Sequence, residues 1–284
     1  MYPPARPKYD TMIEFRKENT AVAQSSLDVD KLDKKVALVT GAGSGLGRAV
    51  AEALAGRGCR LALVDIDAPA ADETARACPG AAVIVRDLCA ADGPDAAVGA
   101  AIAALGGLEL VVNNAGFGVA ESFFAMRAET WDRTLDLNLR AVALICSAAG
   151  RHMRAARRGR IVNITSPASR MALPDYLAYA ASKAGVDAVT RAAALALAPF
   201  GVSVSSVAPG MMDTPMQRIS EQQLAALAGR EDFAAFLAER TARIPLGRRT
   251  DCATVARAVV WLALDAPDDV TAERLNVSGG LDRD

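Results

Sequence analysis

Two side chains that could carry proton chemistry stand four positions apart in this sequence, Tyr179 and Lys183. In a helix, this spacing places the phenol and the ammonium on one face, one turn apart. An ammonium close to a phenol favours the phenolate, so we expect the pKa of Tyr179 to fall from about 10 toward neutrality. A tyrosine tuned in this way can give or take a proton at physiological pH.

The use of lysine along the chain strengthens this interpretation. Only six of the 32 basic residues are lysines, and Lys183 is the only one after Lys35. A compact ammonium beside a phenol or a sugar hydroxyl cannot be replaced by a guanidinium. A lysine kept at this one position therefore indicates a chemical role. Tyr176 and Tyr179 are likewise the only tyrosines after Tyr9.

A glycine-rich segment near the start of the chain could hold a phosphate. Thr40, Gly41, Gly45 and Gly47 form the pattern T-G-x-x-x-G-x-G directly after a β-branched run, and a helical stretch follows. A strand that turns into a helix through such a loop offers free N–H groups and a favourable dipole to a pyrophosphate. The generic spacing G-x-G-x-x-G does not fit these glycines.

The second predicted strand ends at Asp65, twenty residues after Gly45. A carboxylate at this position can accept a hydrogen bond from the ribose 2′-hydroxyl of NAD, and it would repel the 2′-phosphate of NADP. Ser44 stands inside the loop and Ile66 follows the carboxylate, so we expect no cation near a 2′-phosphate. The sequence therefore predicts NAD as the cofactor.

The elements that must position these residues alternate along the chain. Short apolar runs predict strands at 36–40, 61–65, 83–86, 110–113, 161–165, 202–207 and 275–277. Alanine-rich stretches of helical spacing lie between them, among them 46–57, 130–157, 178–198 and 252–264. Continuous apolar strands separated by helices indicate a parallel sheet covered on both faces. We predict a single doubly wound, Rossmann-type α/β domain with seven parallel strands over residues 34–284.

Residues 1–33 differ from the rest, because they are polar and begin with several prolines. Two interpretations stay open for this N-terminal arm. It is a flexible segment, as chain termini often are, or it docks on a neighbouring subunit through the apolar residues Met12, Ile13 and Phe15.

Composition excludes several classes of protein. With 52% hydrophobic residues, 23% charged residues and a net charge of −1, the chain is neither disordered nor basic enough to favour nucleic acid or membrane partners. The single histidine, His152, lies among arginines, so we expect no metal site and no histidine-based hydrolase. The five cysteines include no C-x-x-C pair, which predicts a cytoplasmic protein. No apolar run approaches the length of about 20 residues that spans a bilayer.

Several further motifs occur in a fixed order with those above. The segment Asn113-Asn114-Ala115-Gly116 follows the fourth predicted strand, and Ser166 stands 13 residues before Tyr179. Pro209-Gly210 follows the sixth strand, with Thr214 four residues later. Together with the glycine loop and the Tyr-x-x-x-Lys motif, this set resembles the short-chain dehydrogenase/reductase family.

That resemblance implies catalytic roles for Asn138, Ser166, Tyr179 and Lys183. Tyr179 would exchange a proton with the substrate oxygen, which Ser166 would orient. Lys183 would hold the nicotinamide ribose and lower the pKa of the phenol, and Asn138 would position a water in the proton path. Pro167 departs from the family pattern after the serine, so Thr165 and Ser169 are alternative hydroxyls.

The resemblance also implies the contacts of a bound dinucleotide. The cofactor-binding residues would be Gly41, Ser44, Gly45, Leu46, Gly47, Asp65, Ile66, Asp87, Leu88, Asn114, Ala115, Gly116, Tyr179, Lys183, Pro209, Gly210, Met212 and Thr214. The cofactor would supply or accept a hydride while the protein manages the proton.

A substrate lid is expected over residues 211–245, where the family places it. Substrate contacts would come from Ser166, Tyr176, Tyr179, Met211 and Met216, with Phe117, Met171 and Leu173 on the other side of the site. Methionines make an adaptable apolar wall, and we expect no arginine or lysine cluster there. The predicted substrate is an uncharged, largely apolar secondary alcohol or ketone.

The sequence therefore predicts an NAD-dependent alcohol dehydrogenase with a small-molecule substrate. An NADPH-dependent biosynthetic ketoreductase and a non-catalytic NAD-binding sensor are the alternatives. Family membership further implies a homo-oligomer, a tetramer or a dimer.

Overall fold

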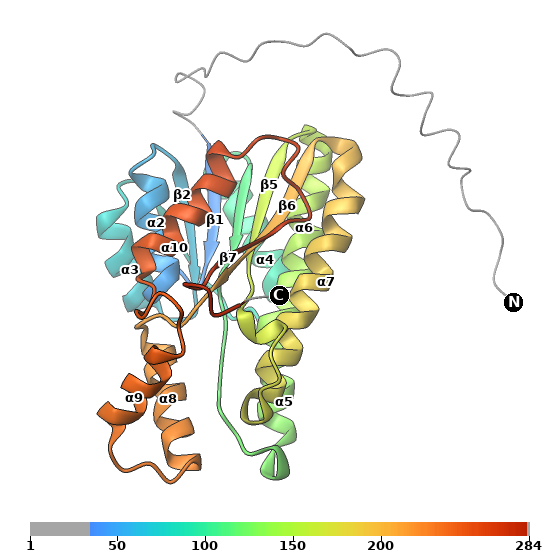
Figure 1. The fold of residues 1–284 in the computed structure, drawn as a ribbon. Helices are drawn as coiled ribbons and strands as arrows, with labels where there is room; N and C mark the ends of the chain where they lie inside the picture. Colours follow the sequence, from blue (N-terminus) through green and yellow to red (C-terminus); the bar gives the residue numbers. More distant parts are fainter. Residues whose placement is uncertain (1–34, 283–284) are drawn as a thin grey trace, which may run out of the picture. The chain divides into compact units, whose positions relative to one another are not determined.

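A parallel sheet forms the centre of the computed structural model, which describes residues 35–282 (Figure 1). Its strands are β1 (Val36–Thr40), β2 (Arg60–Asp65), β3 (Ala82–Val85), β4 (Leu110–Asn113), β5 (Gly159–Ile164), β6 (Val202–Pro209) and β7 (Arg274–Val277). They are ordered β3-β2-β1-β4-β5-β6-β7, and every neighbouring pair is parallel. The strand order reverses between β1 and β4, where doubly wound folds open a binding crevice. The predicted arm, 1–33, lies outside the described residues.

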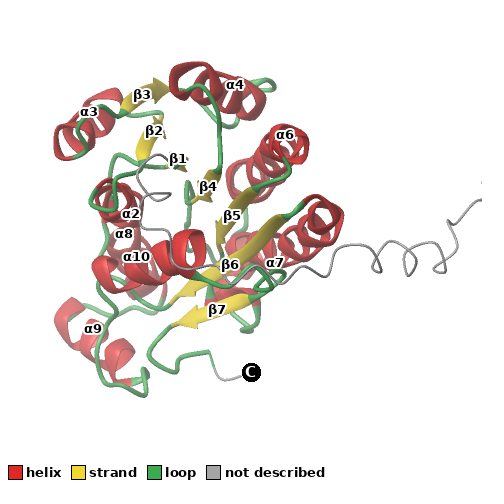
Figure 2. Cartoon of the chain, turned by 90° about the horizontal axis from the view of Figure 1, so that it is seen from above, coloured by secondary structure: helices red, strands yellow, loops and turns green. Residues whose placement is uncertain are grey.

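Helices cover both faces of the sheet (Figure 2). One face carries α4 (Gly93–Leu105), α6 (Ala141–Ala156) and α7 (Leu177–Leu197), and the other carries α2 (Gly45–Ala55), α3 (Ala68–Ala77) and α10 (Cys252–Val260). The residues of strand β1 are buried throughout because each face of the sheet has its own core. Val36 and Leu38 pack into the core on the α4 face, whereas Ala37 and Val39 pack into the core on the α2 face. The predicted doubly wound α/β fold is confirmed.

Three further helices extend beyond the carboxyl ends of the strands (Figure 1). They are α5 (Ala128–Leu135), α8 (Pro215–Leu227) and α9 (Phe233–Ala242). Thr214 caps α8 by accepting from the backbone N–H of Gln217, and Asp232 caps α9 by accepting from that of Ala235. Such caps satisfy N–H groups that a helix leaves free in its first turn. Residues 35–282 contain no helix with the length and apolar character needed to span a bilayer.

The predicted helix 130–157 is not one regular helix. It consists of α5, the π turn η3 (Asp136–Arg140) and α6, and the predicted helix 252–264 is α10 followed by a second π turn, η7 (Trp261–Asp265). A π turn holds one more residue than an α turn does, and the apolar pattern around it stays close to helical. Sequence periodicity therefore finds the helix and misses the turn.

Candidate active site

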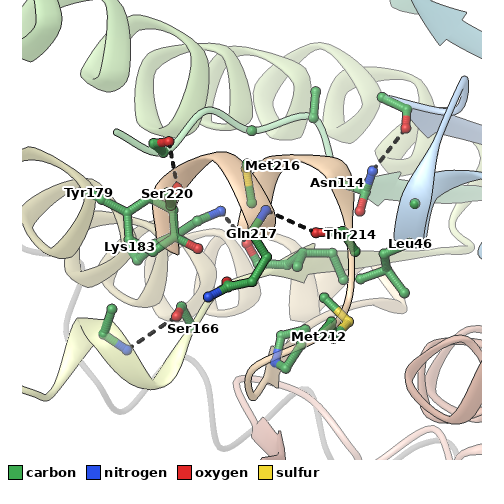
Figure 3. Close-up of a pocket in the computed structure, with 18 of the residues that line it drawn as sticks. Leu46, Asn114, Ser166, Tyr179, Lys183, Met212, Thr214, Met216, Gln217 and Ser220 are labelled. Carbon is green, nitrogen blue, oxygen red and sulfur yellow. Dashed lines mark hydrogen bonds between the residues drawn. The ribbon is translucent and has the colours of Figure 1, made fainter. Parts of the chain in front are cut away.

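A cavity of about 660 Å³ lies at the carboxyl ends of the strands, within the usual size range of ligand sites. Most residues that the sequence predicts for the site line it (Figure 3). From the cofactor set these are Gly41, Ser44, Gly45, Leu46, Asp65, Ile66, Asp87, Leu88, Asn114, Ala115, Gly116, Tyr179, Lys183, Pro209, Gly210, Met212 and Thr214. From the substrate set they are Ser166, Tyr176, Met211 and Met216. Gly47 and Asn138 lie beside the cavity and do not line it.

The glycine loop packs so closely that two of its glycines have no substitute. A Cβ added at Gly47 would lie 1.9 Å from the carbonyl oxygen of Gly41, and one added at Gly41 would lie 2.8 Å from the Cα of Ala115. Gly41 also has a φ of +62°, which L side chains rarely adopt. Helix α2 begins at Gly45 with no acidic residue in its first turn, so its dipole is available to an anion.

Asn114 ties the loop to the next strand of the crevice. Its side-chain amide donates to the carbonyl oxygens of Thr40 and Gly41, at 3.0 and 3.1 Å. The Thr40 hydroxyl oxygen in turn accepts from the backbone N–H groups of Asn114 and Ala115, both at 3.0 Å. These bonds join the ends of β1 and β4 at the switch point of the sheet.

Asp65 lies at the end of β2, but both of its carboxylate oxygens already accept hydrogen bonds. Oδ2 accepts from the backbone N–H of Gly43 at 2.8 Å, and Oδ1 accepts from that of Asp67 at 3.0 Å. The expectation that no cation lies nearby is wrong. Arg86 follows β3 and lines the cavity together with Asp65 and Asp87. Sequence reasoning missed Arg86 because its position depends on the pairing of β2 with β3.

Tyr179 and Lys183 lie one turn apart on α7, with the Lys183 ammonium 5.7 Å from the centre of the phenol ring. The expected fall in the phenol pKa is wrong for the protein's own groups. Burial raises the pKa of Tyr179 to about 12, although a hydrogen bond with Ser166 works in the other direction. Burial also lowers the pKa of Lys183 to about 8, while the nearby Asp187 opposes this. The ammonium donates to the carbonyl oxygen of Ile164 at 2.9 Å, not to the phenol.

Ser166 is the hydroxyl that faces the cavity among the three candidates. Its Oγ accepts from the backbone N–H of Ala168 at 3.2 Å and hydrogen-bonds the Tyr179 phenol. The Thr165 hydroxyl instead donates to the carbonyl oxygen of Lys183. That of Ser169 donates to Asp187. The structure thus brings Ser166 to the reacting groups despite the proline that follows it.

Asn138 is fully buried in the π turn η3. Its carbonyl oxygen accepts from the backbone N–H of Phe117, and its amide donates to the Phe117 carbonyl oxygen, both at 2.7 Å. The amide also donates to the hydroxyl of Ser182 at 3.1 Å. Asn138 therefore fixes the segment after β4 next to α7, and its role toward a water stays a prediction.

Arg274, which the sequence analysis did not predict, holds the backbone at Ser166 in place. Arg274, at the start of β7, donates to the carbonyl oxygen of Ser166 at 2.9 Å, and its side chain is 9% exposed. Its guanidinium also lies 3.5 Å from the Asp187 carboxylate and 2.5 Å from that of Asp282. No local pattern could indicate this role, since the contact joins residues 108 positions apart.

The lid contributes both the expected apolar wall and two arginines that were not expected. Met211 and Met216 line the cavity, as do Met171 and Leu173 from the opposite side. Phe117 lines only a second cavity, which shares Arg133 with the main one. Arg240 and Arg243 line the main cavity. The expectation that the lid brings no arginine cluster to the site is therefore wrong.

The comparison with known proteins decides the family. The family model for short chain dehydrogenases matches residues 35–225. The chain belongs to this family. It is 36% identical to D-erythrulose reductase of Gallus gallus over 249 residues, which cover 86% of this chain and 94% of that protein. It is 38% identical to cis-4-hydroxycyclohexanecarboxylate dehydrogenase of Sinomonas cyclohexanicum, which covers 87% and 96% of the two chains.

A solved structure of the short-chain dehydrogenase fold agrees with the sequence comparison. The actinorhodin polyketide ketoreductase with NADPH superposes with a TM-score of 0.83 at 31% identity, over 89% of this chain and 99% of that one. The chain is thus an oxidoreductase of alcohols and ketones that acts on CH–OH groups and binds a nicotinamide cofactor. Among residues 35–282, no group of three or more His, Cys, Asp or Glu side chains could hold a metal ion.

Proposed function

We propose that this short-chain dehydrogenase uses NAD to interconvert a secondary alcohol and a ketone. The observation that carries the proposal is the position of Ser166, Tyr179 and Lys183, which line one cavity together with the glycine loop. A cofactor bound along the loop would therefore end beside the phenol. The geometry suits hydride transfer in which the protein moves one proton.

The residues present fit a dinucleotide. The start of α2, with its free dipole and the closely packed glycines, would hold the pyrophosphate. Asp65 and Ile66 would lie at the adenosine ribose, and Asp87 and Leu88 at the adenine. Asn114, Ala115, Gly116, Pro209, Gly210, Met212 and Thr214 would follow the cofactor toward its nicotinamide. When bound there, the cofactor supplies or accepts the hydride.

The protein's own groups then handle the proton. Tyr179, whose pKa burial raises to about 12, holds its proton at neutral pH and can donate it to a ketone oxygen. Ser166 hydrogen-bonds the phenol and would orient the same oxygen. The positive charge of Lys183 stabilises the negative charge that builds up on the phenol as the proton leaves. In the direction of alcohol oxidation the same groups act in reverse.

An NADPH-dependent ketoreductase is the second candidate, and Arg86 is the observation that favours it. A guanidinium beside the adenosine end of the cavity could accept a 2′-phosphate. Asp65 opposes that phosphate. We expect kcat/KM to be higher with NAD than with NADP, and the Arg86→Gln variant to keep its NAD activity. A preference for NADP that Arg86→Gln abolishes would establish the second candidate instead.

The test of the proposed function is a screen for NADH production from secondary alcohols. The panel contains acyclic polyols, cyclohexanols and hydroxycyclohexanecarboxylates, which resemble the substrates named for the relatives. NADP runs in parallel, and Tyr179→Phe is the blank, since it removes the proton and leaves the ring. We expect turnover that the variant lacks. Tight NADH binding without turnover of any panel member would instead support the sensor.

We also propose a cytoplasmic homo-oligomer, a tetramer or a dimer, in which residues 34–284 form the enzyme domain and 211–245 the substrate lid. The five cysteines are all free, as expected in a reducing compartment. Light scattering on the full chain and on a chain that begins at residue 34 would measure the assembly. A smaller assembly of the shortened chain would assign the N-terminal arm to a subunit contact, and an unchanged mass would exclude that role.

A further inference from the structure

Two arginines of the lid mark one end of the cavity. Arg240 lies on α9 and Arg243 directly follows that helix, and both line the cavity. The rings of Tyr176 and Tyr179 lie edge to face with their centres 5.9 Å apart. Burial raises the pKa of Tyr176, while a hydrogen bond with Ser220 and the charge of Arg240 work in the other direction. Arg240 is thus close enough to act on Tyr176, whose ring contacts that of the catalytic Tyr179.

The lid carries more positive charge here than its buried carboxylate can balance. Glu221 of α8 is 1% exposed and accepts from both Nη atoms of Arg249, at 2.9 and 2.8 Å. This bidentate pair occupies both carboxylate oxygens in the geometry that carboxylates and guanidinium groups prefer. Arg240 adds a second guanidinium to the same carboxylate, with one contact from Nε at 3.3 Å. One buried negative charge therefore faces two positive ones.

The two lining arginines keep donors available. Arg240 is held in place because its guanidinium lies 5.7 Å from the centre of the Phe236 ring and its Nε bonds Glu221. Within residues 35–282, the Nη atoms of Arg240 donate no hydrogen bond to the protein, and neither does any nitrogen of the Arg243 guanidinium. The Arg240 guanidinium is thus pre-positioned, and the exposed Arg243 adds a second guanidinium with free donors, which is suited to bind an anion.

The cavity also has an apolar part. Met211 and Met216 line it together with Met171 and Leu173, while Gln217 and Ser220 add two polar side chains. A ligand that carries a charge at one end and an apolar body next to the reacting carbon suits this mixed lining. The planar fork of an arginine matches the two oxygens of a carboxylate.

We propose that Arg240 and Arg243 bind a carboxylate of the substrate, which is a hydroxy acid or keto acid with an apolar ring or short chain between its two functional groups. This inference rests on the proposed function, and it replaces the expectation of an uncharged substrate. The lid then selects substrates by charge as well as by shape.

The activity test compares an acid with its own neutral ester. The probes are 4-hydroxycyclohexanecarboxylate and methyl 4-hydroxycyclohexanecarboxylate, assayed with NAD on the wild-type chain and on Arg243→Gln. We expect kcat/KM to favour the acid by about 10- to 100-fold, the usual effect of a hydrogen-bonded charge pair. Arg243→Gln should lower kcat/KM for the acid by at least about tenfold, so that most of the preference for the acid over the ester is lost. Arg248→Gln is the matched control, because this exposed neighbour does not line the cavity.

A binding measurement keeps the inference separate from the proposed function. Cyclohexanecarboxylate and its methyl ester cannot be oxidised, so their effect on the thermal unfolding of the NADH complex reports binding alone. We expect only the carboxylate to raise Tm, in the wild type and in Arg248→Gln but not in Arg243→Gln. Equal effects of acid and ester would overturn the carboxylate site even if the enzyme oxidises neutral alcohols. A larger effect of cyclohexyl phosphate would replace the carboxylate with a phosphate ester.

Discussion

We expect the buried charge of Lys183 to destabilise the folded protein. Its ammonium is buried in α7, where it is 4% exposed, and the environment lowers its pKa from 10.5 to about 8. Replacement by methionine keeps the unbranched stem of the side chain and removes the charge. We therefore expect Lys183→Met to lose catalytic activity and to gain stability, because the charge is useful in the reaction and unfavourable in the folded protein.

The size of the gain follows from the pKa. A folded-state pKa of about 8 against 10.5 in the unfolded chain corresponds to a destabilisation of about 3 kcal/mol at neutral pH. The variant also loses the hydrogen bond from the ammonium to the carbonyl oxygen of Ile164, worth about 1 kcal/mol. The net gain should be about 2 kcal/mol. In a domain of this size that raises Tm by about 4–8 °C.

The pH dependence gives the sharper test. Between about pH 8 and 10.5 the unfolded chain holds the lysine proton and the folded protein has released it, so wild-type stability rises with pH. The advantage of Lys183→Met should therefore be constant below pH 8 and shrink above it. Thermal unfolding without added cofactor, measured from pH 6.5 to 10, follows this difference directly.

The same exchange at Lys35, before β1, is the control and should change stability by less than about 0.5 kcal/mol at any of these pH values. A Lys183→Met protein less stable than wild type at pH 7 would refute the reasoning. A stability advantage of Lys183→Met that stays constant up to pH 10 would also refute it, since such an advantage would have to come from packing instead of charge.

Three other changes test separate parts of the structure. Arg274→Met removes a buried ion-pair partner and should lower stability by about 3–5 kcal/mol. It should also cut kcat at least tenfold and shift its pH profile. Arg160→Met, at the start of β5, removes hydrogen bonds to the Leu262 carbonyl oxygen and to the exposed carboxylate of Asp268, neither of which lines the cavity, so it should lower stability alone. Gly47→Ala places a Cβ 1.9 Å from the Gly41 oxygen, so fluorescence titration should show at least tenfold weaker NADH binding. Burial raises the pKa of Cys146 to about 12, so a thiol reagent should modify it only in the unfolded chain, and rapid modification of the folded protein would contradict this assignment.

The fold could be predicted because its signals are local. Strands such as β4, whose residues are all buried, read as continuous apolar runs, and the helices between them keep their spacing. The glycine loop is equally local, since the turn from strand to helix is made by neighbouring residues. Most of the predicted cofactor residues therefore line the cavity at the carboxyl ends of the strands.

What sequence reasoning missed depends on contacts between distant segments. Arg274 reaches the Ser166 carbonyl from another strand, and Arg243 lines the cavity from the segment after α9, which Arg249 bonds to Glu221 of the lid helix α8. The predicted direction of the phenol pKa was also wrong, because the spacing of Tyr179 and Lys183 gives their distance but not how deeply both are buried. Burial depends on the whole fold.

The π turn η3 constrains the number of residues between α5 and α6. Because a π turn holds one more residue than an α turn does, one deletion between Asp136 and Arg140 would convert it to regular helix while α5 and α6 keep their buried faces. The residues of the turn itself would shift, and Asn138 would lose its hydrogen bonds with Phe117. We expect insertions and deletions to accumulate in the loops of this protein and to be eliminated here, even where single substitutions are tolerated. We therefore expect the length of this turn to be constrained as strictly as the residues of the site.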